Sequence, residues 1–166
     1  AIKPLGNDHF MECELVTSFQ TTTYGKWILS GEHSVLRGQE ALVFPLFSRG
    51  SHFSFTPVLS QKNQFSVKIT GSNAIDIESI VRALVAKAFD ILEREQPGDL
   101  KGEIKIDNHI PLGSGLGASS SLCVAFGRWF EHMGYIQKEM VYEFSRKLEN
   151  LFHGESSGID IAVVLN

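Results

Sequence analysis

Residues 111–121, PLGSGLGASSS, are the part of this sequence best suited to chemistry on an anion. Three glycines fall within five residues, between a predicted strand and a predicted helix whose first turn is rich in serine. Glycines let backbone amides converge on an anion, and a helix start adds unpaired N–H donors and partial positive charge. A serine hydroxyl there can bind a magnesium ion that bridges phosphates. The alternative is a tight turn with a serine cap, but the serine cluster favours a phosphate-binding loop.

Other nucleotide and metal motifs fit less well. Gly113, Gly115 and Ala118 match the dinucleotide fingerprint GxGxxA, but a helical segment, QKEMVYEF, lies where that fold needs a strand ending in an acidic residue. The NTPase motif GxxxxGK[ST] is absent, because the GK pair at 25–26 is followed by tryptophan. A metalloenzyme is disfavoured, since no two of the six histidines are four residues apart.

Three charged residues could supply the other parts of a phosphoryl-transfer site. Lys26 opens the apolar segment KWILS, Glu149 lies beside the apolar stripe of the last predicted helix, and Asp160 precedes the apolar run IAVV. Each also has an ordinary explanation: a solvated lysine, a surface glutamate and a helix N-cap. Phosphoryl transfer needs a phosphate cradle, a cation, a metal held by hydroxyl and carboxylate, and a carboxylate facing the attacking hydroxyl. The sequence offers one candidate for each part.

Hydrophobic periodicity predicts the elements that would position these residues. Alternating or apolar segments predict strands, and apolar residues at steps of three and four predict helices. Residues 51–56 and 65–70 are expected to form a strand pair, and 41–47 an irregular or edge strand because Pro45 interrupts it. Early strands followed by helices indicate an α+β layer fold. The remaining strands are predicted at 10–20, 26–30 and 102–108, and the helices at 77–92, 119–132 and 140–152.

Length and composition indicate one globular domain. The 166 residues carry 15 basic and 19 acidic side chains, a formal charge of −4, which argues against a broad basic face for nucleic acid. The longest apolar stretches fall far short of the ~20 residues of a membrane span. Two cysteines, Cys13 and Cys123, cannot build a disulfide framework, which favours a reducing cytoplasm. The start at Ala1 and the end directly after IAVVL suggest a piece of a longer protein.

Three segments together resemble the motifs of the galactokinase, homoserine kinase, mevalonate kinase and phosphomevalonate kinase (GHMP) superfamily. Residues 24–38, YGKWILSGEHSVLRG, are similar to its first motif, and residues 111–121 to its second, phosphate-binding motif. Residues 153–160, HGESSGID, resemble the segment that carries the catalytic aspartate. The order matches the family, and the first and third segments look most like those of the mevalonate kinase branch. Phosphomevalonate kinases are the nearest rival branch.

The resemblance implies a fold and an activity. The expected fold is a ribosomal protein S5 domain 2-like α+β domain over residues 1–166, with a mixed or antiparallel sheet and helices packed on one side. The expected function is ATP- and Mg²⁺-dependent phosphorylation of a small-molecule alcohol, with mevalonate and isoprenoid precursor synthesis the closest likeness. The expected partners are that substrate and the family's C-terminal domain, which this chain lacks; a homodimer is left open, and neither nucleic acid nor membrane is expected.

The resemblance also implies residue roles. Asp160 would face the substrate hydroxyl as base, and Lys26 beside it would stabilise developing charge. Ser119 and Glu149 would hold magnesium, and Glu32 with His33 would line the acceptor pocket. The residues implied to wrap the ATP phosphates are Gly113, Ser114, Gly115, Leu116, Gly117, Ala118, Ser119 and Ser120.

The sequence departs from the family pattern at several points. Tyr24 replaces the usual proline before Gly25, and Ala118 stands where a first serine is common, so that the metal role rests on Ser119. Because the C-terminal domain is absent, this chain is expected to bind acceptor weakly and not to turn over alone. Two alternatives are a nicotinamide enzyme and a non-catalytic paralogue that keeps the fold as a ligand-binding module. The second is disfavoured because a degenerate site should have lost at least one of its polar residues. The retained residues are Lys26, Ser119, Glu149 and Asp160.

Overall fold

The computed structural model describes residues 17–30, 40, 42–58, 65–95, 100–153 and 159–166. These residues form strands and helices in an order that places most strands before most helices. The elements are β1 (Phe19–Ser30), β2 (Leu42–Pro57), β3 (Ser66–Gly71), α1 (Ala74–Ile91), β4 (Gly102–Asn108), α2 (Ala118–His132), the short 3₁₀ helix η2 (Lys138–Met140), α3 (Val141–His153) and α4 (Ile159–Leu165).

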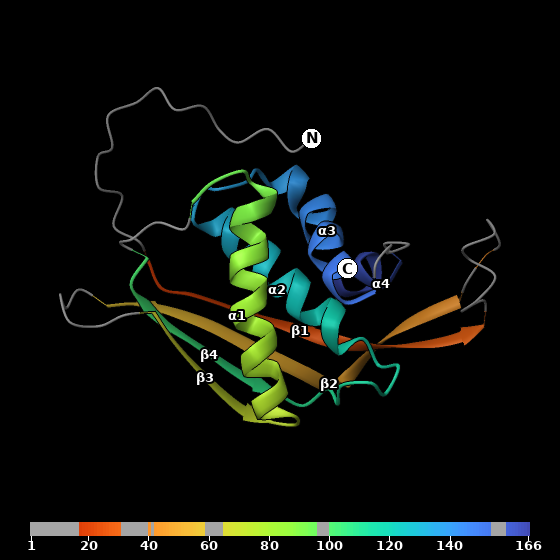
Figure 1. Cartoon of the computed structure of the whole chain (residues 1–166). Helices are drawn as coiled ribbons and strands as arrows, with labels where there is room; N and C mark the ends of the chain where they lie inside the picture. Colours follow the sequence, from red (N-terminus) through yellow and green to blue (C-terminus); the bar gives the residue numbers. More distant parts are fainter. Residues whose placement is uncertain (1–16, 31–39, 41, 59–64, 96–99, 154–158) are drawn as a thin grey trace.

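The described strands form one mixed sheet in the order β1-β2-β4-β3. β2 pairs antiparallel with both β1 and β4, whereas β3 runs parallel to β4. A parallel pair needs a long crossover, and α1 provides it between β3 and β4. The helices lie on one side of the sheet (Figure 1). The predicted α+β architecture, with helices on one side of a mixed sheet, is therefore confirmed.

The strand boundaries differ from those predicted. Residues 26–30 continue β1 without a break, and 41–47 and 51–56 belong to the single strand β2. The pairing changes register where Tyr24 lies opposite Gly50 and Gly25 opposite Leu46, so three residues of β2 bulge out of the ladder. Pro45 is tolerated because this end of β2 pairs only with β1 among the described residues.

One further expectation is corrected by the structure, and one helix was not predicted. The segments at 51–56 and 65–70 do not pair with each other, because β4 lies between β2 and β3. The apolar run at the end of the chain forms the helix α4, which the periodicity did not predict. The helix at 119–132 is confirmed, with α2 beginning one residue earlier, and α3 covers the last predicted helix. The part of the predicted strand at 10–16 lies outside the described residues.

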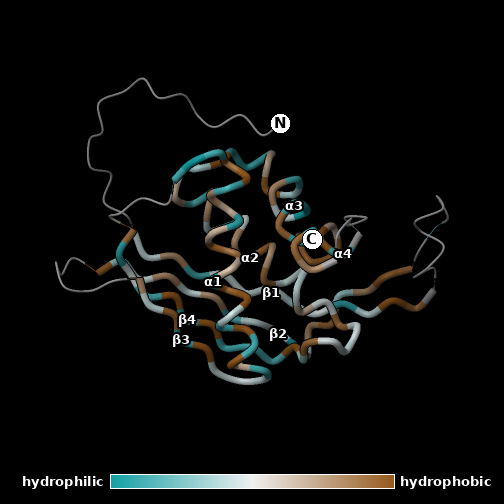
Figure 2. Tube along the Cα trace, in the orientation of Figure 1, coloured by the Kyte–Doolittle hydropathy of each residue, from teal (hydrophilic) through white to brown (hydrophobic). Residues whose placement is uncertain are grey.

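Aromatic rings fill the space between the sheet and α2. Trp129 is fully buried, and its ring centroid lies 4.9 Å from that of Phe55 and 5.6 Å from that of Phe53. On α1, Ile77, Val81 and Leu84 have no exposed surface, as the predicted apolar stripe requires. Hydrophobic stretches recur along the helices and strands that enclose this core (Figure 2). Among the described residues, no helix combines the length and hydropathy that a membrane span requires.

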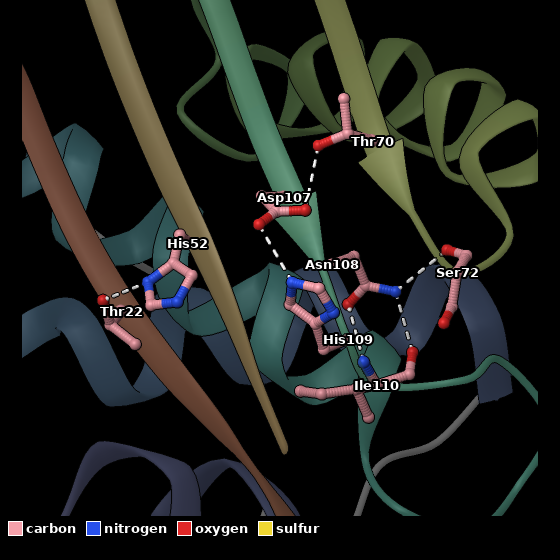
Figure 3. A network of polar contacts seen from close by, with 8 residues as sticks. All are labelled: Thr22, His52, Thr70, Ser72, Asp107, Asn108, His109 and Ile110. Carbon is pink, nitrogen blue, oxygen red and sulfur yellow. Dashed lines mark hydrogen bonds and ion pairs between the residues drawn. The ribbon is translucent and has the colours of Figure 1, made fainter. Parts of the chain in front are cut away.

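The sheet face away from the helices is polar. Glu103 of β4 accepts ion pairs from Lys68 at 2.9 Å and from Lys105 at 3.1 Å, and hydrogen bonds from these two lysines lower the pKa of Glu103. Asp107 accepts a hydrogen bond from Thr70 and pairs with His109, and these two contacts lower the pKa of Asp107 (Figure 3). These charged and polar contacts give this face its polar character.

We expect replacement of a core residue of α1 to show how far the sheet and helices depend on each other. Leu84→Ala should lower the free energy of unfolding by about 2–5 kcal/mol, because Leu84 is fully buried and a cavity remains after truncation. Ile75→Ala on the same helix is the control, and since Ile75 is 85% exposed its effect should stay within about 0.5 kcal/mol. Urea unfolding followed by circular dichroism measures both; equal losses would contradict the assigned core.

Candidate active site

The glycine-rich segment forms a loop between β4 and α2 whose glycines all adopt left-handed backbone conformations. Gly113, Gly115 and Gly117 have φ values of 70°, 74° and 81°, a region that residues with a Cβ enter only with strain. Ser114 folds back within the loop, because its hydroxyl donates to the carbonyl of Pro111 at 2.7 Å. Gly117 directly precedes α2, so the loop delivers the chain to the amino end of a 15-residue helix. The loop and helix start thus provide the amide groups and dipole that favour an anion.

Polar contacts anchor the segment that enters this loop. Asn108, at the end of β4, is buried, and its amide nitrogen donates to the carbonyls of Ser72 at 3.1 Å and Ile110 at 2.8 Å (Figure 3). The backbone amide of Leu112 donates to the side chain of Asn73 at 3.0 Å. Because the base of the loop is bonded on both sides, the position of its glycines is set by the sheet and by the start of α1.

Lys26 connects the loop to the end of the chain. Its side chain is only 5% exposed, and its Nζ lies 3.1 Å from Oδ1 of Asp160, which is 31% exposed. Asp160 lies in the first turn of α4, where the helix dipole favours a carboxylate. A Cβ on Gly117 would approach Cγ of Lys26 to 2.7 Å, so the lysine stem runs directly beneath the last glycine of the loop. The cation, the carboxylate and the loop therefore meet in one place, although Lys26 and Asp160 are 134 positions apart in the chain.

Two hydrogen bonds fix β1 to the loop and to α2. The backbone amide of Lys26 donates to the carbonyl of Leu116 at 2.7 Å. The hydroxyl of Ser121 donates to the carbonyl of Tyr24 at 3.0 Å. Both bonds lie next to the change of register between Tyr24 and Gly25, where the β1–β2 ladder is interrupted. They hold the strand that carries Lys26 at a fixed distance from the loop.

Glu149 of α3 is a buried carboxylate beside the amino end of α2. It is 2% exposed, and its Oε1 accepts a hydrogen bond of 2.5 Å from the hydroxyl of Ser120. The two helices approach closely two turns further along α2, where a Cβ on Gly127 would collide with the hydroxyl of Ser145. This approach, possible only without a side chain at 127, brings Glu149 within reach of the first turn of α2.

Arg128 ties α4 to the rest of the domain. Its guanidinium donates to the side chain of Thr21 at 3.1 Å and to the carbonyls of Thr22 at 3.3 Å and Leu165 at 3.4 Å. Burial lowers the pKa of Arg128. Because these bonds join β1, α2 and the last turn of α4, Arg128 supports the helix that carries Asp160. Neither Arg128 nor Ser121 was predicted from the sequence as a site residue. The lone arginine in the apolar stretch LCVAFGRWF is the signal that points to Arg128.

The structure brings together most of the residues that the sequence analysis singled out. Lys26 pairs with Asp160 and lies against Leu116 and Gly117 of the loop. Ser119, which is half-buried, lies in the same turn of α2 as Ser120. Glu149 accepts a hydrogen bond from Ser120, a residue that was expected to bind phosphate. The residue expected to hold magnesium together with Glu149 was Ser119. Glu32 and His33 lie outside the described residues.

The residues fit a magnesium ion by their chemistry. Carboxylate and hydroxyl oxygens are ligands that Mg²⁺ prefers, and Glu149, Ser119 and Ser120 supply them near the amino end of α2. In the part of the chain that the structure describes, no three His, Cys, Asp or Glu side chains gather as a metal site. Mg²⁺ usually takes one or two carboxylates and completes its shell with phosphates and water, so this sparse set is adequate.

The chain is similar in sequence to known proteins. Residues 83–166 match the family model described as GHMP kinases N terminal domain. The mevalonate kinase of Archaeoglobus fulgidus is 32% identical over 142 residues, covering 82% of this chain and 46% of that protein. The galactokinase of Chloroflexus aurantiacus is 30% identical over 148 residues, covering 81% of this chain and 37% of that protein. The chain thus spans less than half of the length of these relatives.

A solved structure shows the same fold. The crystal structure of mevalonate kinase from methicillin-resistant Staphylococcus aureus superposes with a TM-score of 0.68 at 24% sequence identity. The superposition covers 90% of this chain and 50% of the other. At this identity the likeness establishes the architecture, namely that this chain corresponds in fold to about half of a larger enzyme.

We expect Gly117→Ala to be more harmful than Gly115→Ala. Both glycines have positive φ, so either alanine should cost about 1–2 kcal/mol of stability through backbone strain. Only the Cβ at 117 also collides with Lys26, which should add about 1–3 kcal/mol, whereas nothing lies within 4 Å of a Cβ at 115. Thermal and urea unfolding of the two variants measure the difference. Equal losses would show that the lysine stem does not pass beneath Gly117.

We expect the thiol of Cys123 to be unreactive in the folded protein. Burial, together with the nearby Glu149 carboxylate, raises the pKa of Cys123 well above its usual range. At pH 8 an exposed thiol is partly ionised and reacts with alkylating reagents, but Cys123 should stay protonated and shielded. In a Cys13→Ser background, alkylation should occur only in denaturant. Rapid labelling of the native protein would contradict the burial of α2 beside Glu149.

Proposed function

Because this chain belongs to the GHMP kinase family, we propose that it is the ATP-binding half of a kinase that phosphorylates a small-molecule alcohol. The observation that best supports this proposal is the ion pair between Lys26 and Asp160, which lies directly beside the glycine-rich loop. A phosphate cradle, a buried cation and a partly exposed carboxylate are the parts that phosphoryl transfer to a hydroxyl needs. A tight turn with a serine cap would not need the two charged residues next to it.

In this proposal ATP supplies the phosphoryl group, and Mg²⁺ neutralises charge on its phosphates. The amides of residues 113–118 and the amino end of α2 bind the phosphates, with Ser119, Ser120 and Glu149 holding the metal. The hydrogen bond between Ser120 and Glu149 supports this assignment, because it places a carboxylate and a hydroxyl at the helix end. These residues position the donor and leave the acceptor side to Lys26 and Asp160.

Asp160 accepts the proton of the acceptor hydroxyl as that oxygen attacks. Its 31% exposed carboxylate is open on one side, while Lys26 is almost fully covered. The ammonium fixes the direction of the carboxylate and stabilises negative charge that develops during transfer. Positioning and charge stabilisation account for most of the catalysis in such reactions.

The acceptor that we propose is mevalonate, converted to 5-phosphomevalonate in isoprenoid precursor synthesis. The resemblance of the first and third motifs to mevalonate kinases supports it, as does the relative from Archaeoglobus fulgidus. Glu32 and His33 are proposed to line the acceptor pocket. Since the relatives are more than twice as long as the matched region, the second half of the enzyme would close the other side of this pocket.

We expect Asp160→Asn to remove phosphate transfer by the full-length enzyme that contains this chain. The substitution keeps the size of the side chain and deletes the base, so kcat should fall about 10²–10⁴-fold while ATP binding persists. The measurement is ADP release with mevalonate as acceptor. The matched control is Asp90→Asn on α1, a carboxylate 71% exposed, which should leave the rate unchanged. A rate in Asp160→Asn equal to that of the control would remove Asp160 from the mechanism.

The same assay with a panel of acceptors tests the substrate. Mevalonate should give a higher kcat/KM than phosphomevalonate, homoserine or galactose. A higher kcat/KM with galactose would instead indicate a galactokinase. Magnesium-dependent ATP binding without transfer to any acceptor would instead favour a non-catalytic paralogue, and protection against unfolding by a nicotinamide cofactor but not by ATP would overturn the kinase.

A further inference from the structure

The outer edge of β1 is bonded to α2 and to the glycine-rich loop. Among the described strands β1 lies at the end of the sheet, and Thr22, Tyr24 and Lys26 direct backbone polar groups to the edge that faces away from β2. The carbonyls of Thr22 and Tyr24 accept hydrogen bonds from Arg128 and Ser121 of α2. The amide of Lys26 donates to the loop. The helix that begins at the loop therefore also sets the position of the strand that carries Lys26.

Arg128 bonds to α4 as well as to β1. Its Nη1 donates to the hydroxyl of Thr21 at 3.1 Å and to the carbonyl of Thr22 at 3.3 Å. Its Nη2 donates to the carbonyl of Leu165, in the last turn of α4, at 3.4 Å. α4 packs against both α2 and β1 (Figure 1). One side chain thus joins the three elements that surround it.

β1 and α4 are consequently joined at two separate places. Lys26 and Asp160 form one junction, and Arg128 forms the other between Thr22 and Leu165. The junctions are four residues apart along β1, about 13 Å at the rise of a strand. They are five residues apart along α4, about 7–8 Å at the rise of a helix. A short helix held at one point can pivot about it, and the second junction prevents this.

The chemistry of arginine suits this second junction. Ile161 and Val164 hold α4 against the core, but hydrophobic burial is not directional and does not by itself fix the rotation of a helix. A guanidinium presents five N–H donors in a fixed plane, so it can bond to acceptors on two elements at once. Its positive charge is also favourable at the carboxyl end of α4, where the helix dipole is negative.

We propose that Arg128 is a positioning residue for phosphoryl transfer, because it transmits the position of α2 to Asp160. The phosphates of ATP are proposed to bind at the amino end of α2, and the base that faces the acceptor lies on α4. A misplacement of about 1 Å between reacting groups can cost about 10²-fold in rate, so the two helices must keep a fixed relation. The expected effect on rate rests on the proposed function, whereas the effect on the pair of Lys26 and Asp160 does not.

Chemical labelling of Lys26 tests the structural part of the proposal without catalysis. Lys26 is 5% exposed in its pair with Asp160. In the full-length enzyme, Arg128→Met keeps an unbranched stem and removes the charged donors, so α4 should open from β1. Acetic anhydride at fixed pH should then acetylate Lys26 at least about 10-fold faster, as mass spectrometry measures. The matched control is Arg82→Met on α1, whose guanidinium is 55% exposed and pairs with Glu78, and it should leave the labelling unchanged.

The kinetics of the same variants test the catalytic part. With mevalonate as acceptor, kcat of Arg128→Met should fall about 10–100-fold, while KM for ATP stays within about 2-fold because the loop is unchanged. Arg128→Lys should recover part of kcat, since it keeps a charge and a donor at the end of α4. A purely structural role would lower only the amount of folded enzyme, which circular dichroism measures, and not kcat per folded molecule.

The two measurements separate the ways in which the proposal can fail. Unchanged labelling of Lys26 in Arg128→Met would overturn it, as would equal effects in Arg82→Met. Faster labelling with an unchanged kcat per folded molecule would overturn the positioning role in catalysis. If the enzyme without substitutions transfers phosphate to no acceptor, the proposed function fails, and the labelling alone then decides whether Arg128 holds Asp160 in place.

Discussion

One buried ammonium group requires three separate segments of the chain to meet. A buried lysine needs an opposite charge at close range, because removing an unpaired ion from water costs several kcal/mol. Asp160 supplies that charge to Lys26 at 3.1 Å, and it does so from the far end of the chain. β1, the glycine-rich loop and α4 must therefore come together for the pair to form. The core beneath them sets their positions, and the polar side of the site is built on that frame.

The parts of the site with local signals could be predicted from the sequence. Gly113, Gly115 and Gly117 predicted a glycine-rich loop, and the structure shows left-handed backbone at all three. The serine-rich helix α2 begins within one residue of its predicted start. The long amphipathic helix α1 was equally clear, because eighteen residues give several turns of periodicity. Such features depend on neighbours in the chain, so a single sequence contains what is needed to recognise them.

The parts that depend on distant neighbours could not be predicted in the same way. α4 has only seven residues, and several of them are β-branched, so their sequence does not predict a helix. Tertiary packing decides its form, since Ile161 and Val164 are buried and Arg128 bonds to its last turn. The long strand β2 was predicted as two strands because the sequence does not show that one strand continues through Pro45 and the bulge. Resemblance to a family located Asp160, but only the packing of α4 explains its distance from Lys26.

The close approach of α2 and α3 has a consequence for how such sequences can change. A side chain at Gly127 would occupy the space of the Ser145 hydroxyl, so the two positions share a volume that holds a single small group. A lineage that enlarges one of them must reduce the other or separate the helices, and separation would carry Glu149 away from Ser120. Positions 127 and 145 should therefore covary, because both are tied to the spacing of helices that holds Glu149 next to Ser120.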